Sequence, residues 1–391
     1  MDTAKSRPAA IVIGGHFQGL GAIRALGMQG VAVTLVDSEP NIGRFSKYVT
    51  HFFKSPPVTA HEAFLSFLID KAERHDLKGA VLYPINDETV AFLSKNHPIL
   101  QKYFTLWTPD WPAVEPLYHK GMGYQLAERI GLPIPKTEYP ENLEDVRQYR
   151  GPFPALIKPA VMRSFFTQTG QKVFTAENPD ALVAAYQRAL QFIPSDEILI
   201  QEMIPDVSDN LYSFCPLFDG EKVLARIVAK RLRQHPMDFG QASTYAETVF
   251  LPELEAMGTK YLQAVGYSGL GEVEFIRDPR DGQFKFLEVN PRIWGWHTLA
   301  LAAGVNLPYL TYLWSIGEDV MQEGYGRARW VRLLTDIAVG ITESFRGRWT
   351  LPEYFRSLRG AKAYAVWSLK DPLPFLGELF LLPYLMIKRG F

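Results

Sequence analysis

The chain has 391 residues, of which 47% are hydrophobic and 21% are charged, so it holds enough apolar side chains for roughly two or three globular domains. Its 41 basic and 42 acidic residues give a formal net charge of -1, which lacks the basic excess that binding to a nucleic-acid backbone requires. The one cysteine, Cys215, excludes an intrachain disulfide and fits a small core residue in a cytoplasmic protein.

The first hundred residues alternate short apolar runs with amphipathic stretches. The apolar runs at 10–13, 31–36 and 80–85 are separated by helix-like segments such as 17–29 and 60–74. This alternation predicts strands and helices arranged around a parallel sheet. The first apolar run is too short for the core of a signal peptide, so we do not expect export.

The turn after the first predicted strand contains several glycines. Gly14, Gly15, Gly19 and Gly21 follow the strand, and Asp37 ends the next one, as in a dinucleotide-binding turn. The glycine spacing differs from the G-x-G-x-x-G pattern. We therefore interpret the segment as a tight strand-to-helix turn with a helix N-terminus open to an anion, and a nicotinamide-dependent dehydrogenase is the alternative.

A proline-rich passage at 107–116 separates this unit from a helix predicted at roughly 118–130. From 153 to 291, β-branched and aromatic runs predominate, with helices near 179–191 and 252–265. This composition is typical of an α+β layout. We expect a first domain of residues 1–112, a second of 113–310 and a C-terminal extension of 311–391.

The apolar segment 373–391 raises the question of a membrane contact. Glu378 and Pro383 interrupt the segment, and it falls short of the ~20 apolar residues that a spanning helix needs. We expect no transmembrane span and a segment that docks onto the protein itself. A peripheral contact with a membrane or a partner is the alternative.

The most informative segment is a predicted antiparallel hairpin with an acidic face. Two alternating runs, 271–277 and 284–290, flank a turn made by Asp278-Pro279-Arg280-Asp281-Gly282. A turn centred near Arg280 or Asp281 places Glu274 opposite Glu288 and Glu272 opposite Asn290, all on one face. The other face is predicted to carry Val273, Phe275, Leu287 and Val289.

Directly opposed carboxylates repel each other unless a cation lies between them, one is protonated, or water screens them. Magnesium prefers a few carboxylate or carbonyl oxygens and completes its shell with water and phosphate. The pattern predicts that Glu274, Glu288 and Asn290 bind magnesium, and a solvated acidic face is the alternative. Arg292 lies two residues beyond Asn290, where a fixed cation would stabilise charge that develops during group transfer.

The run Glu288-Val289-Asn290-Pro291-Arg292, after a strand that carries Glu274, resembles the ATP-grasp superfamily. The resemblance covers about residues 10–310. It implies a Rossmann-like pre-ATP-grasp domain at 1–112 and an ATP-grasp domain of two α+β lobes, 113–203 and 204–310. It also implies ATP and Mg²⁺ as cofactors, with Mn²⁺ as a substitute.

The same resemblance implies contacts to the nucleotide. Lys120, in His119-Lys120-Gly121, and Lys158, in the run 153–159, take the places of two phosphate-binding lysines. In the run 199–205, backbone groups bind adenine and apolar side chains pack against its ring. The residues of this hinge are Glu202, Met203 and Ile204, and Asp209 is placed either to meet a ribose hydroxyl or to form a turn.

One segment departs from the family. Residues 160–170 contain a single glycine, Gly170, where many members have a glycine-rich phosphate loop. We expect side chains to replace part of that loop, from among Arg163, Ser164, Thr167 and Lys172. This departure and the run 231–240 resemble the carboxylate–amine ligases related to D-aspartate ligase.

The resemblance implies a ligase that uses ATP to convert a small carboxylate into an acyl phosphate. An amine then captures the acyl group, and ADP and phosphate are released. Lys158 and Arg292 are the expected catalytic residues. The sequence identifies neither the carboxylate nor the amine, and a homodimer is compatible with it.

Two sets of residues are candidates for contacts with these substrates. Arg226, Arg231 or Arg233 would steer the carboxylate, or else balance surface acids. Asn86, Asp87 and Glu88 follow a predicted parallel strand and would meet the amine, although Asn86 also fits a helix N-cap. The alternative functions are an ATP-grasp kinase or carboxylase, and a nonenzymatic nucleotide-binding protein of a membrane assembly.

Overall fold

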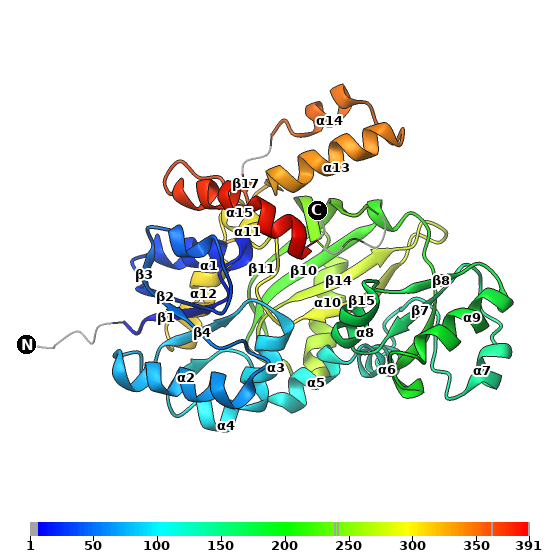
Figure 1. Ribbon diagram of the computed structural model, residues 1–391, viewed down its shortest axis with the longest axis horizontal. Coiled ribbons are helices and arrows are strands. Elements are labelled where there is room, and N and C mark those ends of the chain that lie inside the picture. The colour runs from blue at the N-terminus through cyan, green and yellow to red at the C-terminus, as the bar shows by residue number, and fades with distance from the viewer. Residues whose placement is uncertain (1–6, 238–239, 241, 361–362, 390–391) are drawn as a thin grey trace, which may run out of the picture.

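The computed structural model describes residues 7–389, except for 238, 239, 241, 361 and 362. The described residues form three β-sheets of five, four and eight strands. In Figure 1 the five-stranded sheet lies at the left, the eight-stranded sheet in the centre and the four-stranded sheet at the right. The predicted combination of an α/β unit with α+β lobes is confirmed.

The N-terminal sheet is parallel, as predicted, with the strand order β3-β2-β1-β4-β5. The order reverses between β1 and β4, so the loops after these two strands border a crevice at the carboxyl edge of the sheet. Its strands are β1 (Ala10–Ile13), β2 (Val33–Asp37), β3 (Val49–Lys54), β4 (Val81–Pro84) and β5 (Thr105–Leu106). Its helices are α1 (Phe17–Gly27), η1 (Gly43–Phe45), α2 (His61–Arg74), α3 (Asp87–Lys95) and α4 (His97–Leu100).

Two helices, α5 (Trp111–Tyr118) and α6 (Lys120–Arg129), lead to the four-stranded antiparallel sheet, whose order is β6-β9-β7-β8. Helix α9 packs on this sheet and buries Leu182 and Tyr186 against Ile157 and Ile200. Its strands are β6 (Thr137–Glu138), β7 (Ala155–Pro159), β8 (Phe174–Ala176) and β9 (Ile198–Glu202). The accompanying helices are α7 (Leu143–Arg147), α8 (Met162–Thr169), α9 (Pro179–Ala189) and η2 (Ser195–Glu197).

The eight-stranded sheet has the order β15-β14-β10-β11-β12-β16-β17, and β13 pairs with β10. Helix α10 (Pro252–Val265) packs against it, where Gly258 lies close to Phe214. The sheet follows η3 (Val207–Asp209) along the chain. Its strands are β10 (Leu211–Phe218), β11 (Val223–His235), β12 (Ala242–Val249), β13 (Gly269–Leu270), β14 (Glu272–Arg277), β15 (Phe284–Asn290), β16 (Arg329–Val331) and β17 (Ala363–Tyr364).

The register of the β14–β15 hairpin confirms the predicted pairing. Glu274 lies opposite Glu288 and Glu272 lies opposite Asn290. The prediction for Leu287 is wrong, because the register shifts between Glu274 and the next residue of β14. This bulge gives β15 one extra residue and turns the side chain of Leu287 away from the core face. Leu287 packs instead with an apolar group that includes Ile276.

The C-terminal region joins the other units of the fold. Strand β16 pairs with β12, so it extends the eight-stranded sheet. Arg24 of α1 donates to the Asp371 carboxylate (Nε–Oδ2 2.9 Å) just before α15, and α15 contacts η1. This packing agrees with the docking predicted for the apolar segment. The helices are α11 (Thr298–Ala302), α12 (Leu307–Ser315), α13 (Leu333–Phe345), α14 (Leu351–Ser357) and α15 (Leu373–Arg389).

The predicted domain limits stay a proposal. The limit at 112 falls inside α5 and the limit at 310 falls inside α12. The limit at 203 falls between β9 and η3. Among the residues described, no helix combines the length and apolar character that crossing a bilayer demands.

Candidate functional site

A cavity of about 920 Å³ is lined by residues from the four-stranded and eight-stranded sheets and from the first turns of α1 and α3. Helix α1, which follows β1, contributes Phe17 and Gln18, and helix α3, which follows β4, contributes Asp87 and Glu88. This is the crevice that the reversal of strand order creates. The cavity also contains Asn290 and most of the charged residues that the sequence singles out, namely Lys120, Lys158, Lys172, Arg231, Glu274, Glu288 and Arg292.

The acidic wall of the cavity comes from the β14–β15 hairpin. Asn290 donates its side-chain amide to Glu274 (Nδ2–Oε1 2.7 Å) and to Glu272 (Nδ2–Oε2 3.2 Å). Arg231 of β11 lies between the same two carboxylates, 3.5 Å from Glu272 and in direct contact with Glu274. Glu288 forms an ion pair with Lys120, the first residue of α6. Each of the directly opposed glutamates, Glu274 and Glu288, therefore has a protein cation beside it.

The two glutamates of β14 have opposite pKa shifts. Burial raises the pKa of Glu272 above its usual range, and the negative charge of Glu274 raises it further. Burial also acts to raise the pKa of Glu274, but the charge and hydrogen bond of Arg231 outweigh burial and lower that pKa. Glu274 is thus held as the ionised member of the pair, in the form that a cation would bind.

Two partly buried lysines, Lys158 and Lys172, line the cavity. Lys158 donates to the Tyr124 hydroxyl (3.0 Å) and to the side-chain carbonyl oxygen of Gln201 (2.8 Å). Lys172 donates to the backbone carbonyl of Gly240 (2.7 Å). Within the part of the chain that the structure describes, neither ammonium forms an ion pair. Burial lowers the pKa of both lysines to about 8, so a bound anion would stabilise their charged forms.

The donor set of the hairpin fits a hard divalent cation. Glu274, Glu288 and Asn290 offer carboxylate and amide oxygens, which are the ligands that Mg²⁺ takes alongside water and phosphate. In the described residues, no group of three or more histidine, cysteine, aspartate or glutamate side chains could hold a metal ion. A cation at this hairpin would therefore need further oxygens from a ligand.

Arg292 connects the hairpin to the N-terminal unit. Its guanidinium donates to the Asp87 carboxylate (Nε–Oδ1 2.6 Å) and to the Asn290 side-chain oxygen (3.0 Å). Asp87, predicted to contact a substrate, lines the cavity but is occupied by this ion pair. Glu88 also lines the cavity. Asn86 caps α3 by accepting from the backbone N–H of Thr89 (2.8 Å), so the N-cap reading of Asn86 is the one the structure supports.

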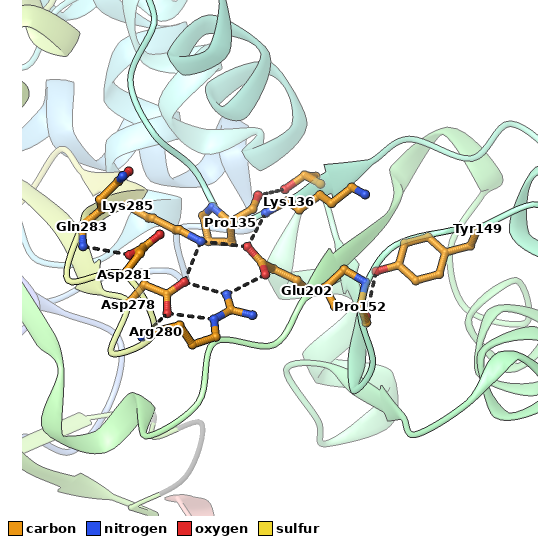
Figure 2. A network of polar contacts seen from close by, with 11 residues as sticks. Pro135, Lys136, Tyr149, Pro152, Glu202, Asp278, Arg280, Asp281, Gln283 and Lys285 are labelled. Atoms are coloured by element: carbon orange, nitrogen blue, oxygen red, sulfur yellow. Dashed lines mark hydrogen bonds and ion pairs between the residues drawn. The ribbon is translucent and has the colours of Figure 1, made fainter.

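The predicted hinge lines the cavity, and the side chain of Glu202 has a structural role that the sequence did not indicate. Figure 2 shows its carboxylate between Arg280 (2.7 Å) and Lys285 (3.0 Å), both of which also pair with Asp278. The backbone N–H of Lys136 donates to the same carboxylate (2.9 Å). Glu202 therefore fastens the end of β9 to the turn of the β14–β15 hairpin.

An apolar patch lies beside this hinge. Ile204, Leu211 and Ile276 are buried together, and Leu287 packs against them. All four line the cavity. Among the backbone hydrogen bonds of the described residues, none involves the amide of Ile204. A flat ring on this patch would find apolar side chains on its face and a backbone donor at its edge.

Helix α8 stands where the family has a glycine-rich loop. Met162 and Phe166 of this helix line the cavity together with Thr167, one of the predicted phosphate contacts. The side chains of Arg163 and Ser164, two further candidates, lie outside the described residues. The part of the cavity predicted to receive the phosphates is thus bordered by a helix with apolar side chains and by Lys172.

Two of the arginines predicted to steer a carboxylate lie away from the cavity and pair with acids, which is the alternative that the sequence left open for them. Arg226 pairs with Glu255 of α10 (2.5 Å). Arg233 is buried against Asp336 of α13 (2.7 Å). Strand β11 has register shifts between Arg231 and Arg233, so these two side chains point to opposite faces, although their spacing predicts the same face. Only Arg231 of the three lines the cavity in the described part of the chain.

Asp209 and Asp37 also differ from nucleotide-binding expectations. Asp209 is exposed at the end of η3 and is not among the residues that line the cavity, so its ribose contact stays a prediction. Asp37 accepts from the backbone N–H groups of Gly15 (2.6 Å) and Glu39 (3.0 Å). Its carboxylate closes the turn after β1, which removes the acid that a nicotinamide site would use for ribose.

Comparisons with known proteins find similarity in the region that contains the hairpin. A family profile named "Carbamoyl-phosphate synthase L chain, ATP binding domain" matches residues 220–320. The chain is 26% identical over 148 residues to the mitochondrial acetyl-CoA carboxylase of Saccharomyces cerevisiae (strain YJM789), a match of 36% of this chain and 6% of that protein. It is 23% identical over 237 residues to the D-aspartate ligase of Enterococcus faecium (strain Aus0004), a match of 57% of this chain and 54% of the ligase. The chain therefore matches a small part of the carboxylase and about half of the ligase.

Solved structures resemble most of the chain. The biotin carboxylase domain of the Hydrogenobacter thermophilus 2-oxoglutarate carboxylase, a dimer in complex with MgADP and bicarbonate, superposes with a TM-score of 0.64 at 18% identity. That match covers 82% of this chain and 72% of the other. The L-amino acid ligase from Bacillus licheniformis superposes with a TM-score of 0.62 at 15% identity. That match covers 80% of this chain and 75% of the ligase. At such identities the likeness concerns the fold.

Proposed function

The chain belongs to the ATP-grasp superfamily, and from that premise we propose that it joins a small carboxylate to an amine with ATP and magnesium. One observation carries this proposal. Two partly buried lysines that form no ion pair with a described residue, Lys158 and Lys172, share a cavity with the opposed carboxylates of Glu274 and Glu288. A polyanion that arrives with a divalent cation matches both features at once.

The nucleotide would lie along the cavity with its base on the apolar patch. Ile204, Leu211, Ile276 and Leu287 would pack on the adenine ring, and the backbone of the hinge would bind its edge. The phosphates would then reach Lys158 and Lys172, which line the same cavity. Such contacts align the terminal phosphate and neutralise its charge.

The metal ligands in this proposal are Glu274, Glu288 and Asn290. Mg²⁺, or Mn²⁺ in its place, would neutralise charge on the phosphate oxygens when it is bound there. In the described structure Lys120 lies on Glu288 and Arg231 lies on Glu274. Both cations are therefore placed to keep these carboxylates ionised and oriented toward the cavity.

The reaction proceeds in two steps that need no covalent protein nucleophile. A carboxylate oxygen attacks the γ-phosphorus, the bond to the β-phosphate oxygen breaks, and ADP leaves. The amine nitrogen then attacks the acyl carbon, phosphate leaves, and the nitrogen loses a proton as the amide forms. Arg292 lies at the end of the acidic hairpin, where its guanidinium would stabilise the oxyanion of the second step.

A carboxylase on the same scaffold is the second candidate. It is favoured by the similarity to acetyl-CoA carboxylase and by the fold shared with a biotin carboxylase domain. In that reaction bicarbonate is the carboxylate that receives the phosphoryl group. We keep the homodimer and the cytoplasmic location as predictions.

The decisive experiment is a screen of small carboxylates and amines for stimulated phosphate release, with mass spectrometry of the products. We expect release that needs both substrates and a product whose mass equals their sum less one water. Stimulation by bicarbonate alone, with incorporation of labelled carbon, would favour the carboxylase. The variant Glu288→Gln should lose the activity, while Glu62→Gln, an exposed change in α2, should keep it.

A further inference from the structure

The C-terminal helices expose an unusual concentration of large apolar side chains. In Figure 1, α13, α14 and α15 all lie along the upper edge of the molecule. Within the described part of the chain, most of the exposed large hydrophobic residues belong to these helices and to the segment that joins them. We call this set the C-terminal apolar face: Ile341, Phe345, Leu351, Phe355, Tyr364, Trp367, Leu369, Leu373, Leu376, Leu379 and Phe380.

Helix α15 is apolar on two sides. Its inner side packs on the protein, where Gly377 lies against Phe45 of η1. Its outer side carries Leu373, Leu376 and Phe380, which are 56%, 57% and 81% exposed. These positions recur every three or four residues, so they form one stripe along the helix. A helix that is apolar all round normally has a covering on both sides.

Helices α13 and α14 repeat this arrangement. Ile341 and Phe345 lie one turn apart on α13, and Phe345 is 87% exposed. Leu351 and Phe355 lie one turn apart on α14. Neighbouring helices thus present apolar stripes outward, while their opposite sides are buried. A concentration of exposed large apolar side chains marks a surface that binds something apolar.

Most of the exposed charged residues around this face are basic. Arg346, Arg356, Arg359 and Lys370 are exposed between 341 and 380. Glu353 is the one exposed acid of the described residues in that interval, whereas Glu343, Asp371 and Glu378 are buried. Beside α15, the η1 segment adds exposed Arg44 and Lys47. The whole chain has a net charge of -1, so this excess of cations is local.

We propose that the C-terminal apolar face docks on the surface of an anionic lipid bilayer. Aromatic and leucine side chains would enter the interface between headgroups and acyl chains, and the surrounding cations would bind the anionic headgroups. A second copy of the chain fits the face less well, because it would bring the same cations against one another. The contact is peripheral, and it does not depend on the function proposed for the cavity.

The test is flotation of the full-length protein with two kinds of vesicle, one of phosphatidylcholine and one of equal parts phosphatidylcholine and phosphatidylglycerol. We expect binding to the mixed vesicles, weaker binding to the neutral ones, and release as salt is raised. Phe345→Ser with Phe380→Ser should weaken binding at least about tenfold, because both rings would leave the interface. Arg356→Gln with Arg359→Gln should weaken it about 30-fold on the mixed vesicles, from ~1 kcal/mol for each cation.

Matched controls change exposed residues away from the face. Met321→Ser, which replaces an 84% exposed apolar side chain, and Arg129→Gln should bind vesicles as the unchanged protein does. All these positions are exposed, so the variants should unfold at an unchanged temperature. The proposal is overturned if the protein does not float with mixed vesicles. It is also overturned if the phenylalanine variant floats normally, or if that variant only converts a dimer to a monomer.

Discussion

Binding of a nucleotide should be linked to proton uptake by Lys158 and Lys172. Burial lowers the pKa of both ammonium groups from 10.5 to about 8 in the free protein. In the free protein, about a tenth of each side chain is neutral at pH 7, about half at pH 8 and about nine tenths at pH 9. A triphosphate stabilises the charged form, so each neutral lysine must take up a proton on binding.

The expected size of the effect follows from these fractions. Binding should take up about 0.2 protons at pH 7, about one at pH 8 and about 1.8 at pH 9 from the two lysines together. Below pH 8 both lysines are already charged, and affinity is at its maximum. As pH rises from 8 toward 10.5, affinity should fall by about tenfold per pH unit for each lysine.

Calorimetric titration in buffers with different ionisation enthalpies measures this uptake directly. Lys158→Met should halve the uptake at pH 8, and Lys78→Met, an exposed change before β4, should leave it intact. A protein that binds the nucleotide with no proton uptake between pH 8 and 9 would refute the reasoning. So would an uptake that Lys158→Met leaves unchanged.

Three further predictions concern single positions. Glu288→Gln should lower magnesium-dependent ADP release at least about 100-fold with cooperative unfolding retained, since the metal loses a charged ligand, and near-normal release would contradict the assignment. Glu202→Ala should lower the free energy of unfolding by about 2 to 3 kcal/mol in chemical denaturation, because Lys285 loses a buried partner, and a change within error would contradict this. Asp371→Ala should lower the free energy of unfolding by about 3 to 5 kcal/mol in the same measurement, because it leaves Arg24 buried without its carboxylate partner. The double variant Arg24→Leu with Asp371→Leu should lower it by less, because no unpaired charge remains buried.

Local patterns carried the sequence predictions furthest. Alternation of apolar residues is enough to indicate the parallel N-terminal sheet, and the Pro and Asp-Gly turn fixes which residues of the hairpin face each other. Glu274 opposite Glu288 is the result on which the metal proposal depends. The parallel sheet and the pairing within the hairpin depend on residues that are close in sequence, so both can be predicted from the sequence alone.

The errors arise where the period of a strand breaks. An alternating pattern assigns each side chain to a face of the sheet from the two-residue period of a strand. One bulge therefore moves every side chain beyond it to the opposite face from the one predicted. The bulge of β15 moved Leu287 onto the cavity side, and the register shifts in β11 separated Arg233 from Arg231. No residue type in these runs indicates a bulge in advance.

Contacts between distant segments were also beyond the sequence. Glu202 meets Arg280 and Lys285 across more than seventy residues, and Arg292 meets Asp87 across more than two hundred. Their side chains look like ordinary surface charges until the sheets come together. The exposed stripes of α13 and α14 are similar, because an apolar helix face predicts burial unless the packing is known.

The bonds of Glu202 affect how the molecule can open. A hinge at 203–205 would normally let one half of such an enzyme swing away from the other. Here the Glu202 carboxylate, just before that hinge, is bound to Arg280 and Lys285 of the β14–β15 hairpin, so the end of β9 is expected to move together with the hairpin. We therefore expect a ligand to enter and leave by movement of other parts of the cavity wall, of which α8 is one.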